Sequence, residues 1–101
     1  MIVVTGKFKL TNPASALELQ QATMKTLTES RKEPGCIVYE FSQVIGEGPT
    51  FRVYEEWEDE AALAAHSQMP YVIAFNDALA KAGVEEKSVM KFEGGPKTAL
   101  G

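Results

Sequence analysis

The stretch Cys36–Trp57, CIVYEFSQVIGEGPTFRVYEEW, decides the fold because it reads as two β-strands joined by a short loop. Residues 36–44 and residues 50–57 are rich in β-branched and aromatic side chains, which favour strands. Between them, Gly46-Glu-Gly-Pro49 carries the glycine and proline residues typical of a turn. Two strands joined by so short a loop run antiparallel, so we expect a hairpin at the centre of the chain.

The segment before this hairpin reads as a strand followed by a helix. Residues 2–10 are β-rich and alternate weakly between apolar and polar side chains, which predicts a strand. Asn12 suits a helix cap and Pro13 the first helical position, so we expect a helix from residue 14 to about residue 32. Pro34-Gly35 ends this helix and turns the chain. The apolar stripe of the helix comprises Ala16, Leu17, Leu19, Met24 and Leu27.

The segment after the hairpin reads as two helical pieces and a last strand. The acidic run at residues 58–60 opens a helix that reaches about Ser67, because negative charge stabilises a helix N-terminus. Pro70 breaks or restarts this helix, and a further helical piece spans residues 71–82. Residues 84–93 form the final strand.

The resulting order is strand, helix, strand, strand, helical pair, strand. Short connections and right-handed crossovers make a ferredoxin-like βαββαβ unit the simplest α+β topology for this order. Its helices would cover one face of a four-stranded antiparallel sheet. We expect a single domain over residues 1–93 and a short C-terminal tail over residues 94–101, which begins with Gly-Gly-Pro.

Apolar side chains stand on both parities of the predicted strands. In the two hairpin strands, one parity carries Ile37, Tyr39, Phe41, Phe51, Val53 and Trp57, and the other carries Cys36, Val38 and Tyr54. In the last strand, Met90 and Phe92 share one parity and Val89 takes the other. Since helices cover only one face, we expect a second copy to cover the other, giving a homodimer that packs sheet to sheet. The alternative is that Val38, Tyr54 and Val89 are merely half exposed.

Composition narrows the possible partners and cofactors. The chain has 101 residues and a formal net charge of −4, with no basic cluster, so we expect neither nucleic acid nor a membrane surface as a partner. No segment is long and apolar enough for a signal peptide or a membrane span, so we expect a cytoplasmic protein. One cysteine and one histidine, far apart in sequence, offer no metal-site spacing, so no metal is expected.

The ordered set Glu33-Pro-Gly-Cys36, Tyr39, Tyr54-Glu-Glu-Trp57, Ala62-Leu63 and His66 resembles the antibiotic biosynthesis monooxygenase family, including its quinol monooxygenase members. The resemblance implies a dimeric α/β barrel, in which two ferredoxin-like units pack their sheets face to face. It also implies oxidation of an electron-rich aromatic compound by dioxygen, with no flavin, metal or other cofactor.

Two positions depart from subclasses of this family. Members that oxygenate polyketide anthrones carry a side-chain amide on the strand before the tryptophan, where this chain has Val53. Haem-degrading members carry an asparagine early in the first strand, where this chain has Thr5. Both subclasses are therefore less well matched than the quinol-oxidising members.

His66 and Tyr39 are candidate catalytic residues. His66 is the sole histidine, and an imidazole exchanges protons near neutral pH, which suits a general base that takes a phenolic proton. The alternative is that His66 only stabilises a helix C-terminus through the helix dipole. Tyr39 is a candidate to stabilise an oxyanion or a semiquinone.

Glu55 and Trp57 complete the candidate catalytic set. Trp57 ends its strand and either stacks on a flat substrate or simply fills the core. Glu55 shares its parity, and a carboxylate on an apolar face needs a partner. Glu55 therefore either orients His66 or pairs with Arg52 or Lys91, and the sequence leaves this choice open.

Five further residues are candidate substrate-binding positions in a cavity between the helices and the sheet. They are Gln20, Met24, Tyr71, Val72 and Phe75. Gln20 is a polar residue inside the apolar stripe of the first helix, and it either binds a ligand or pairs with a strand carbonyl. For the others, filling the core is the alternative.

The function expected from the sequence is a cofactor-independent monooxygenase that acts on a small quinol or polyphenol with dioxygen. One alternative is a non-catalytic dimer that binds a small molecule or serves a stress response. Another is a haem-binding or haem-degrading monooxygenase.

Overall fold

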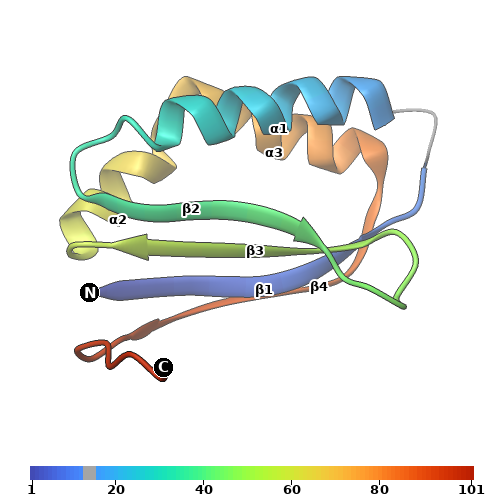
Figure 1. Cartoon of the computed structure of the whole chain (residues 1–101). Coiled ribbons are helices and arrows are strands. Elements are labelled where there is room, and N and C mark those ends of the chain that lie inside the picture. Colours follow the sequence, from blue (N-terminus) through green and yellow to red (C-terminus); the bar gives the residue numbers. More distant parts are fainter. Residues whose placement is uncertain (13–15) are drawn as a thin grey trace.

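The computed structural model describes residues 1–12 and 16–101, with the side chain of Ala16 outside the described part. In chain order the elements are β1 (Ile2–Leu10), α1 (Ala16–Ser30), β2 (Cys36–Gln43), β3 (Thr50–Trp57), α2 (Glu60–Ser67), α3 (Pro70–Ala82) and β4 (Val84–Glu93) (Figure 1). The predicted order of elements is confirmed. The predicted helix start at Pro13 and Ala14 lies outside the described residues, and α1 ends at Ser30 rather than near Lys32.

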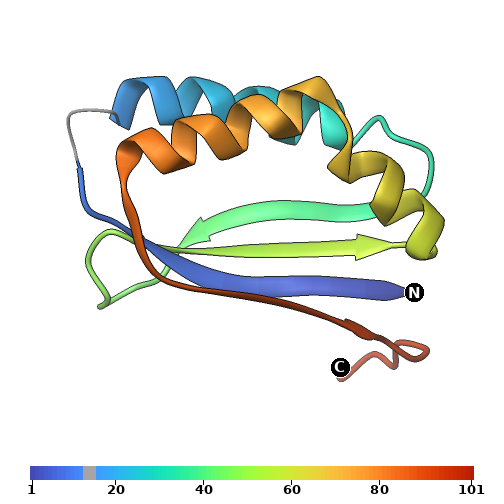
Figure 2. The same cartoon turned by 180° about the vertical axis from the view of Figure 1, so that it is seen from behind.

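The strands form one antiparallel sheet in the order β2-β3-β1-β4. Helices α1 and α3 lie side by side over one face of this sheet (Figure 1). From behind, α2 and α3 lie on the side of the molecule where β4 forms the sheet edge (Figure 2). This is the predicted ferredoxin-like α+β arrangement, and no described helix covers the other face of the sheet.

Local sequence signals account for the starts of α2 and α3. Asp59 caps α2, since its Oδ1 accepts a hydrogen bond of 2.8 Å from the backbone N–H of Ala62. Pro70 occupies the first turn of α3, where its missing N–H costs no hydrogen bond. Pro70 therefore restarts the helix, one residue earlier than the sequence predicts.

The even-numbered positions of β1 face the helices. Strand pairing sets Ile2 opposite Trp57 and Phe8 opposite Phe51, so these side chains share the helix-facing side of the sheet. One buried cluster contains Ile2, Tyr39 and Trp57, and the other contains Phe8, Leu19, Phe75, Ala78, Leu79 and Ala82. Each large apolar side chain buried in this way stabilises the fold by about 1.5–3 kcal/mol.

The register corrects the predicted faces of two residues. In β2, Cys36 lies opposite Trp57 and Val38 opposite Glu56, so one extra residue, Ile37, forms a bulge. Cys36 consequently packs with the helix-side cluster and not with Val38 on the other face. Val89 lies opposite Gly6, which also puts it on the helix side. Alternation alone assigned Cys36 and Val89 wrongly, because a bulge changes parity and the register of β4 depends on its partner strand.

The predicted apolar stripe of α1 is wrong at two positions. Leu17 is 69% exposed and Met24 is 56% exposed, whereas the polar residues Thr26 and Ser30 are fully buried. Thr26 is accommodated because its hydroxyl donates a hydrogen bond of 3.1 Å to the backbone carbonyl of Tyr71 in α3. Compared with the predicted stripe, α1 is therefore rotated about its axis, which buries the hydrogen bond between Thr26 and α3.

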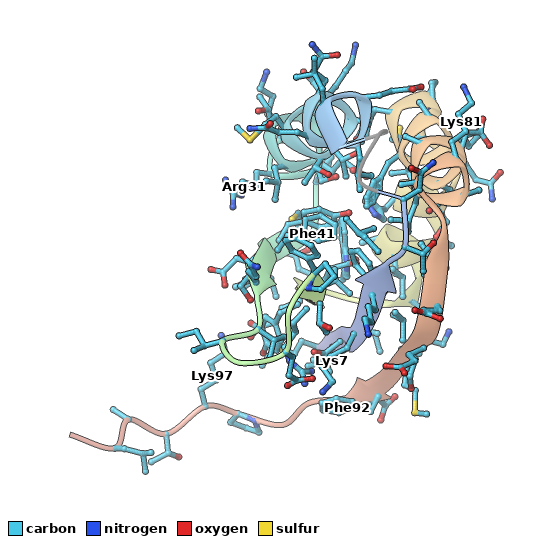
Figure 3. All side chains as sticks on the ribbon, turned by 90° about the vertical axis from the view of Figure 1, so that its right-hand side faces the viewer. Lys7, Arg31, Phe41, Lys81, Phe92 and Lys97 are labelled. Atoms are coloured by element: carbon cyan, nitrogen blue, oxygen red, sulfur yellow. The ribbon has the colours of Figure 1, made fainter. Side chains whose placement is uncertain are left out.

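The face of the sheet opposite the helices carries both polar and apolar side chains. Met90 and Phe92 are 69% and 53% exposed, and Tyr54 donates a hydrogen bond to Glu56. Phe41 points between the layers, whereas Lys7 and Phe92 lie on the side away from the helices (Figure 3). The predicted homodimer would cover this face and stays a prediction.

The C-terminal tail contacts the sheet at two points. The backbone N–H of Gly94 donates to the carbonyl of Met1 at 2.9 Å, and Lys97 pairs with Glu56 at 2.6 Å. The division into a domain over residues 1–93 and a tail stays a prediction. In the described part of the chain, no helix has the length and apolar character needed to span a membrane.

Candidate active site

His66 lies in the last turn of α2 and is buried. Its Nδ1 is 2.8 Å from Oε2 of Glu33, a carboxylate that is equally buried. The hydroxyl of Tyr71 donates a second hydrogen bond, of 2.5 Å, to the same oxygen. We assign the ring hydrogen to Nδ1, because the carboxylate oxygen is the acceptor in this contact; in the neutral imidazole this tautomer leaves the lone pair on Nε2.

Glu33 reaches His66 because a tight turn holds it against α2. Gly35 has φ of 86°, a left-handed conformation that glycine adopts without steric cost. Its carbonyl accepts a hydrogen bond of 2.8 Å from Glu58, and a Cβ added at Gly35 would lie 2.6 Å from Cβ of Ala62. The turn is therefore locked to the start of α2, and Glu33 is carried with it.

Glu55 lies on the other side of the imidazole. Its Oε1 accepts a hydrogen bond of 2.9 Å from Nε1 of Trp57 and lies 3.9 Å from Nε2 of His66. Burial raises the pKa of Glu55, and the hydrogen bond from Trp57 and the nearby His66 act in the opposite direction. His66 thus sits between two carboxylates, one hydrogen-bonded to Nδ1 and one near Nε2.

The structure decides the alternatives left open for Glu55. Arg52 donates from Nη1 to the hydroxyl of Thr5, at 3.3 Å, and Lys91 pairs with Glu60 at 3.0 Å. Neither cation reaches Glu55, whose hydrogen-bond donor is Trp57. The residue that holds the imidazole through a direct hydrogen bond is Glu33.

Aromatic rings pack around the imidazole. The ring centroids of Trp57 and His66 are 4.6 Å apart, and those of Tyr39 and His66 are 5.2 Å apart. Burial is the main cause that raises the pKa of Tyr39 far above its ordinary value, and the charge of Glu55 adds to it. The Tyr39 hydroxyl lies near the side chain of Ser30, and a phenol with its pKa raised in this way is suited to donate a hydrogen bond rather than to act as a base.

A cavity of about 390 Å³ opens beside these residues, between the sheet and helices α2 and α3. We call it the His66 cavity, and its lining includes Tyr39, Glu55, His66, Val72, Phe75 and Lys87. Trp57 is fully buried and does not line the cavity, but it contacts two residues that do, Glu55 and His66. The four predicted catalytic residues and two of the predicted substrate-binding residues are thus brought together.

The other three predicted substrate-binding residues lie elsewhere. Gln20 and Met24 line a second cavity of about 390 Å³ between α1 and the sheet, which we call the α1 cavity. Phe8 and Phe41 line both cavities and therefore form the wall between them. Tyr71 lines neither and instead binds Glu33 through its hydroxyl. Helix rotation and the placement of the dividing rings are tertiary features that spacing does not reveal.

Glu33 is the site residue that sequence reasoning missed. The signal was present, since Glu33 is the first residue of the Glu-Pro-Gly-Cys turn that carried the family resemblance. A carboxylate fixed by a rigid turn is well suited to orient another side chain. In the described part of the chain, no group of three or more His, Cys, Asp or Glu residues is placed to hold a metal ion.

The family model for antibiotic biosynthesis monooxygenases matches residues 1–78 of this chain. The chain belongs to the antibiotic biosynthesis monooxygenase family. The match includes every residue of the site around His66 except Leu79 of α3 and the β4 side chains that line the cavity. Membership in this family supports a monooxygenase-like function for the chain.

Two other proteins are similar in sequence to the chain. It is 38% identical over 74 residues to the uncharacterised protein sll1783 of Synechocystis sp., covering 73% of this chain and 50% of that protein. It is 31% identical over 75 residues to YcnE of Bacillus subtilis, provisionally named a monooxygenase, covering 74% of this chain and 78% of YcnE. The chain thus spans about half the length of sll1783.

Solved structures share the fold of this chain. A Deinococcus radiodurans protein provisionally assigned as an antibiotic biosynthesis monooxygenase superposes with a TM-score of 0.86 at 24% identity, covering 99% of this chain and 98% of its own. Rv0793 of Mycobacterium tuberculosis gives a TM-score of 0.81 at 16% identity, covering 98% of this chain and 100% of its own. At these identities the likeness establishes the fold alone.

Proposed function

We propose that this protein is a monooxygenase that oxidises a small quinol or polyphenol with dioxygen and without a cofactor. The observation that carries this proposal is the buried imidazole of His66, whose Nδ1 is held by Glu33 while Nε2 is left with a lone pair beside a cavity with largely apolar walls. Membership in the monooxygenase family supports the same reaction class.

The proposed reaction begins with a proton transfer. Nε2 of His66 accepts the phenolic proton of the bound substrate, and the resulting anion is electron-rich enough to give one electron to dioxygen. The substrate radical and superoxide combine, forming a carbon–oxygen bond at a ring carbon that carries hydrogen. The peroxide anion takes back the proton that His66 holds, and loss of water from the resulting hydroperoxide leaves a carbonyl. One oxygen atom thus enters the product and the other leaves as water.

The chain's own residues supply the conditions for these steps. Glu33 keeps the imidazole in one tautomer and stabilises the positive charge that His66 acquires. The protonated hydroxyl of Tyr39 can donate a hydrogen bond to the phenolate oxygen. Apolar walls formed by Val72 and Phe75 exclude water, which would otherwise compete for the anion.

The test is oxygen consumption with a naphthohydroquinone, in wild type and in His66→Ala. We expect the variant to lose about a hundredfold in kcat, the lower end of what a general base contributes. Gln68→Ala, at an exposed residue next to the end of α2, serves as the matched control and should keep the wild-type rate. A wild-type rate no higher than autoxidation would refute the activity, and equal rates in wild type and His66→Ala would remove His66 from the mechanism.

We also propose that two copies pack through the sheet faces that the helices leave uncovered. Met90 and Phe92 expose large apolar surfaces there, and Val38 and Tyr54 are half-buried on the same face of the sheet. Sedimentation should give twice the 11.0 kDa of the chain for wild type and the single-chain mass for Phe92→Glu. A wild-type protein that sediments as a single chain at working concentrations would contradict this proposal.

A further inference from the structure

A lysine without an ion-pair partner lies at the edge of the His66 cavity. Lys87 belongs to the edge strand β4 and lines this cavity together with Val89. Five of the seven other lysines are paired with carboxylates, namely Lys7, Lys32, Lys81, Lys91 and Lys97, and among the described residues Lys9 and Lys25 form no ion pair either. Among the residues that the structure describes, none forms an ion pair with Lys87. Lys87 is exposed and its side chain lines the cavity, so its ammonium group is free to turn toward a ligand bound there.

A bulge in β4 determines that Lys87 takes this position. Lys7 lies opposite Ser88 and Lys9 opposite Glu85, so β4 has one more residue than β1 between these pairs. Glu86 adopts φ of 53°, a left-handed conformation that costs a residue other than glycine about 1–2 kcal/mol. Bulges of this kind occur next to active sites, where they redirect a side chain.

Because of the bulge, Lys87 rather than Glu86 faces the cavity. Glu85 lies opposite Lys9, on the side of the sheet away from the helices. With regular alternation the next residue, Glu86, would face the helices and Lys87 would face away. Since the extra residue shifts the parity, Lys87 faces the helices in line with Val89 and lines the cavity.

The register of the strands separates the charged groups that line the cavity. Val4 pairs with Glu55 on one side and with Lys91 on the other, so Lys87 lies four residues along β4 from the level of Glu55, and His66 lies beside Glu55. Lys87 lies on the edge strand, in a chain whose formal net charge is −4. A ligand with an acidic group would gain a charge-assisted hydrogen bond from Lys87 and would keep that group away from Glu55.

We propose that the His66 cavity takes an aromatic compound that carries an acidic group, with that group on Lys87 and a phenolic hydroxyl toward His66. Within the proposed quinols and polyphenols, the preferred substrates are thus those that also carry an acidic group, such as a hydroxylated aromatic carboxylate. The placement of the phenolic hydroxyl near His66 rests on the proposed function. The preference for an acidic group does not, because it is measured by binding alone.

Binding is measured with 6-hydroxy-2-naphthoate and with its neutral amide, 6-hydroxy-2-naphthamide, by quenching of the fluorescence of Trp57. This is the sole tryptophan, and its ring packs against His66. We expect wild type to bind the acid about three- to tenfold more tightly than the amide at low salt, as for a partly exposed ion pair. Raising the salt concentration should reduce this ratio.

Lys87→Met should abolish the preference for the acid, and Lys87→Arg should retain most of it. Lys9→Met is the matched control, because it removes the same charge from the opposite face of the sheet and should keep the wild-type preference. Glu86→Gly should also keep the preference while raising the melting temperature, because glycine adopts the left-handed conformation freely.

Equal affinity of wild type for the acid and the amide would overturn this inference, as would the same loss of preference in Lys87→Met and Lys9→Met. The proposed function fails separately. Charge-dependent binding without oxygen consumption would refute the monooxygenase activity and leave the inference standing, whereas quinol turnover without any charge preference would refute the inference alone.

Discussion

Trp57→Phe should destabilise the protein by an amount that grows with pH. Trp57 is 0% exposed, and its Nε1 donates a hydrogen bond of 2.9 Å to the buried Glu55. Phenylalanine keeps an aromatic ring at this position but removes part of the buried volume and the donor. The variant therefore loses packing at every pH, and it loses a hydrogen bond whose strength depends on the charge of Glu55.

The packing loss is about 2 kcal/mol, roughly half of what removing a whole buried tryptophan side chain costs. A hydrogen bond to a neutral carboxyl adds about 1 kcal/mol, and one to a charged carboxylate adds about 2–3 kcal/mol. We therefore expect the free energy of unfolding to fall by about 3 kcal/mol at pH 4 and by about 4–5 kcal/mol at pH 8.

The destabilisation by Trp57→Phe grows with pH because the pKa of Glu55 is raised. Burial raises this pKa above the ordinary value of 4.5, so folding favours the protonated form, and the associated stability is lost as pH rises through the folded-state pKa. The hydrogen bond from Trp57 lowers the pKa and limits this loss. Without the indole, the pKa of Glu55 rises further and the loss on ionisation is larger.

The assay is urea unfolding between pH 4 and pH 8 at one fixed protein concentration, followed by circular dichroism because the variant has no tryptophan. Repeating Trp57→Phe in a Glu55→Gln background is the control, since glutamine does not ionise and the pH dependence of the loss should vanish. Two results would refute this reasoning. One is a loss of unfolding free energy that is the same at pH 4 and at pH 8, and the other is a loss that still depends on pH in the Glu55→Gln background.

Two further predictions concern the site and the sheet. Glu33→Gln should lower kcat for quinol oxidation about tenfold and leave KM unchanged, because Glu33 positions His66 and does not line the cavity; a change confined to KM would contradict that role. Gly6→Ala should cost about 1–3 kcal/mol of unfolding free energy in urea titrations, since the added Cβ would lie 1.9 Å from the backbone oxygen of Ser88. Gly95→Ala is its control, because nothing lies within 4 Å of a Cβ added there. Equal stability of the two variants would contradict the prediction, since it would mean that β4 shifts to accommodate the methyl group without loss of stability.

The sequence predicted the candidate site in part. His66, Glu55, Trp57 and Tyr39 meet as expected, because strand parity places Tyr39, Glu55 and Trp57 on one face and α2 follows β3 directly. Gln20 and Met24 were assigned to the same cavity but line the α1 cavity instead. Their distance from His66 depends on how α1 is rotated on the sheet, which a helical wheel does not specify.

The sequence by itself determined the order of the elements, the antiparallel hairpin and the ends of the strands, because glycine, proline and alternating apolar residues act over a few neighbouring positions. The tertiary structure alone decided which carboxylate holds His66, which side of the sheet Cys36 and Val89 occupy, and which charge reaches the cavity from β4. These features depend on one-residue bulges and on contacts between residues as far apart as Glu33 and His66. A bulge changes the face of the sheet that each following side chain occupies, but it leaves no mark in the local sequence pattern. Only the pairing of the strands reveals it.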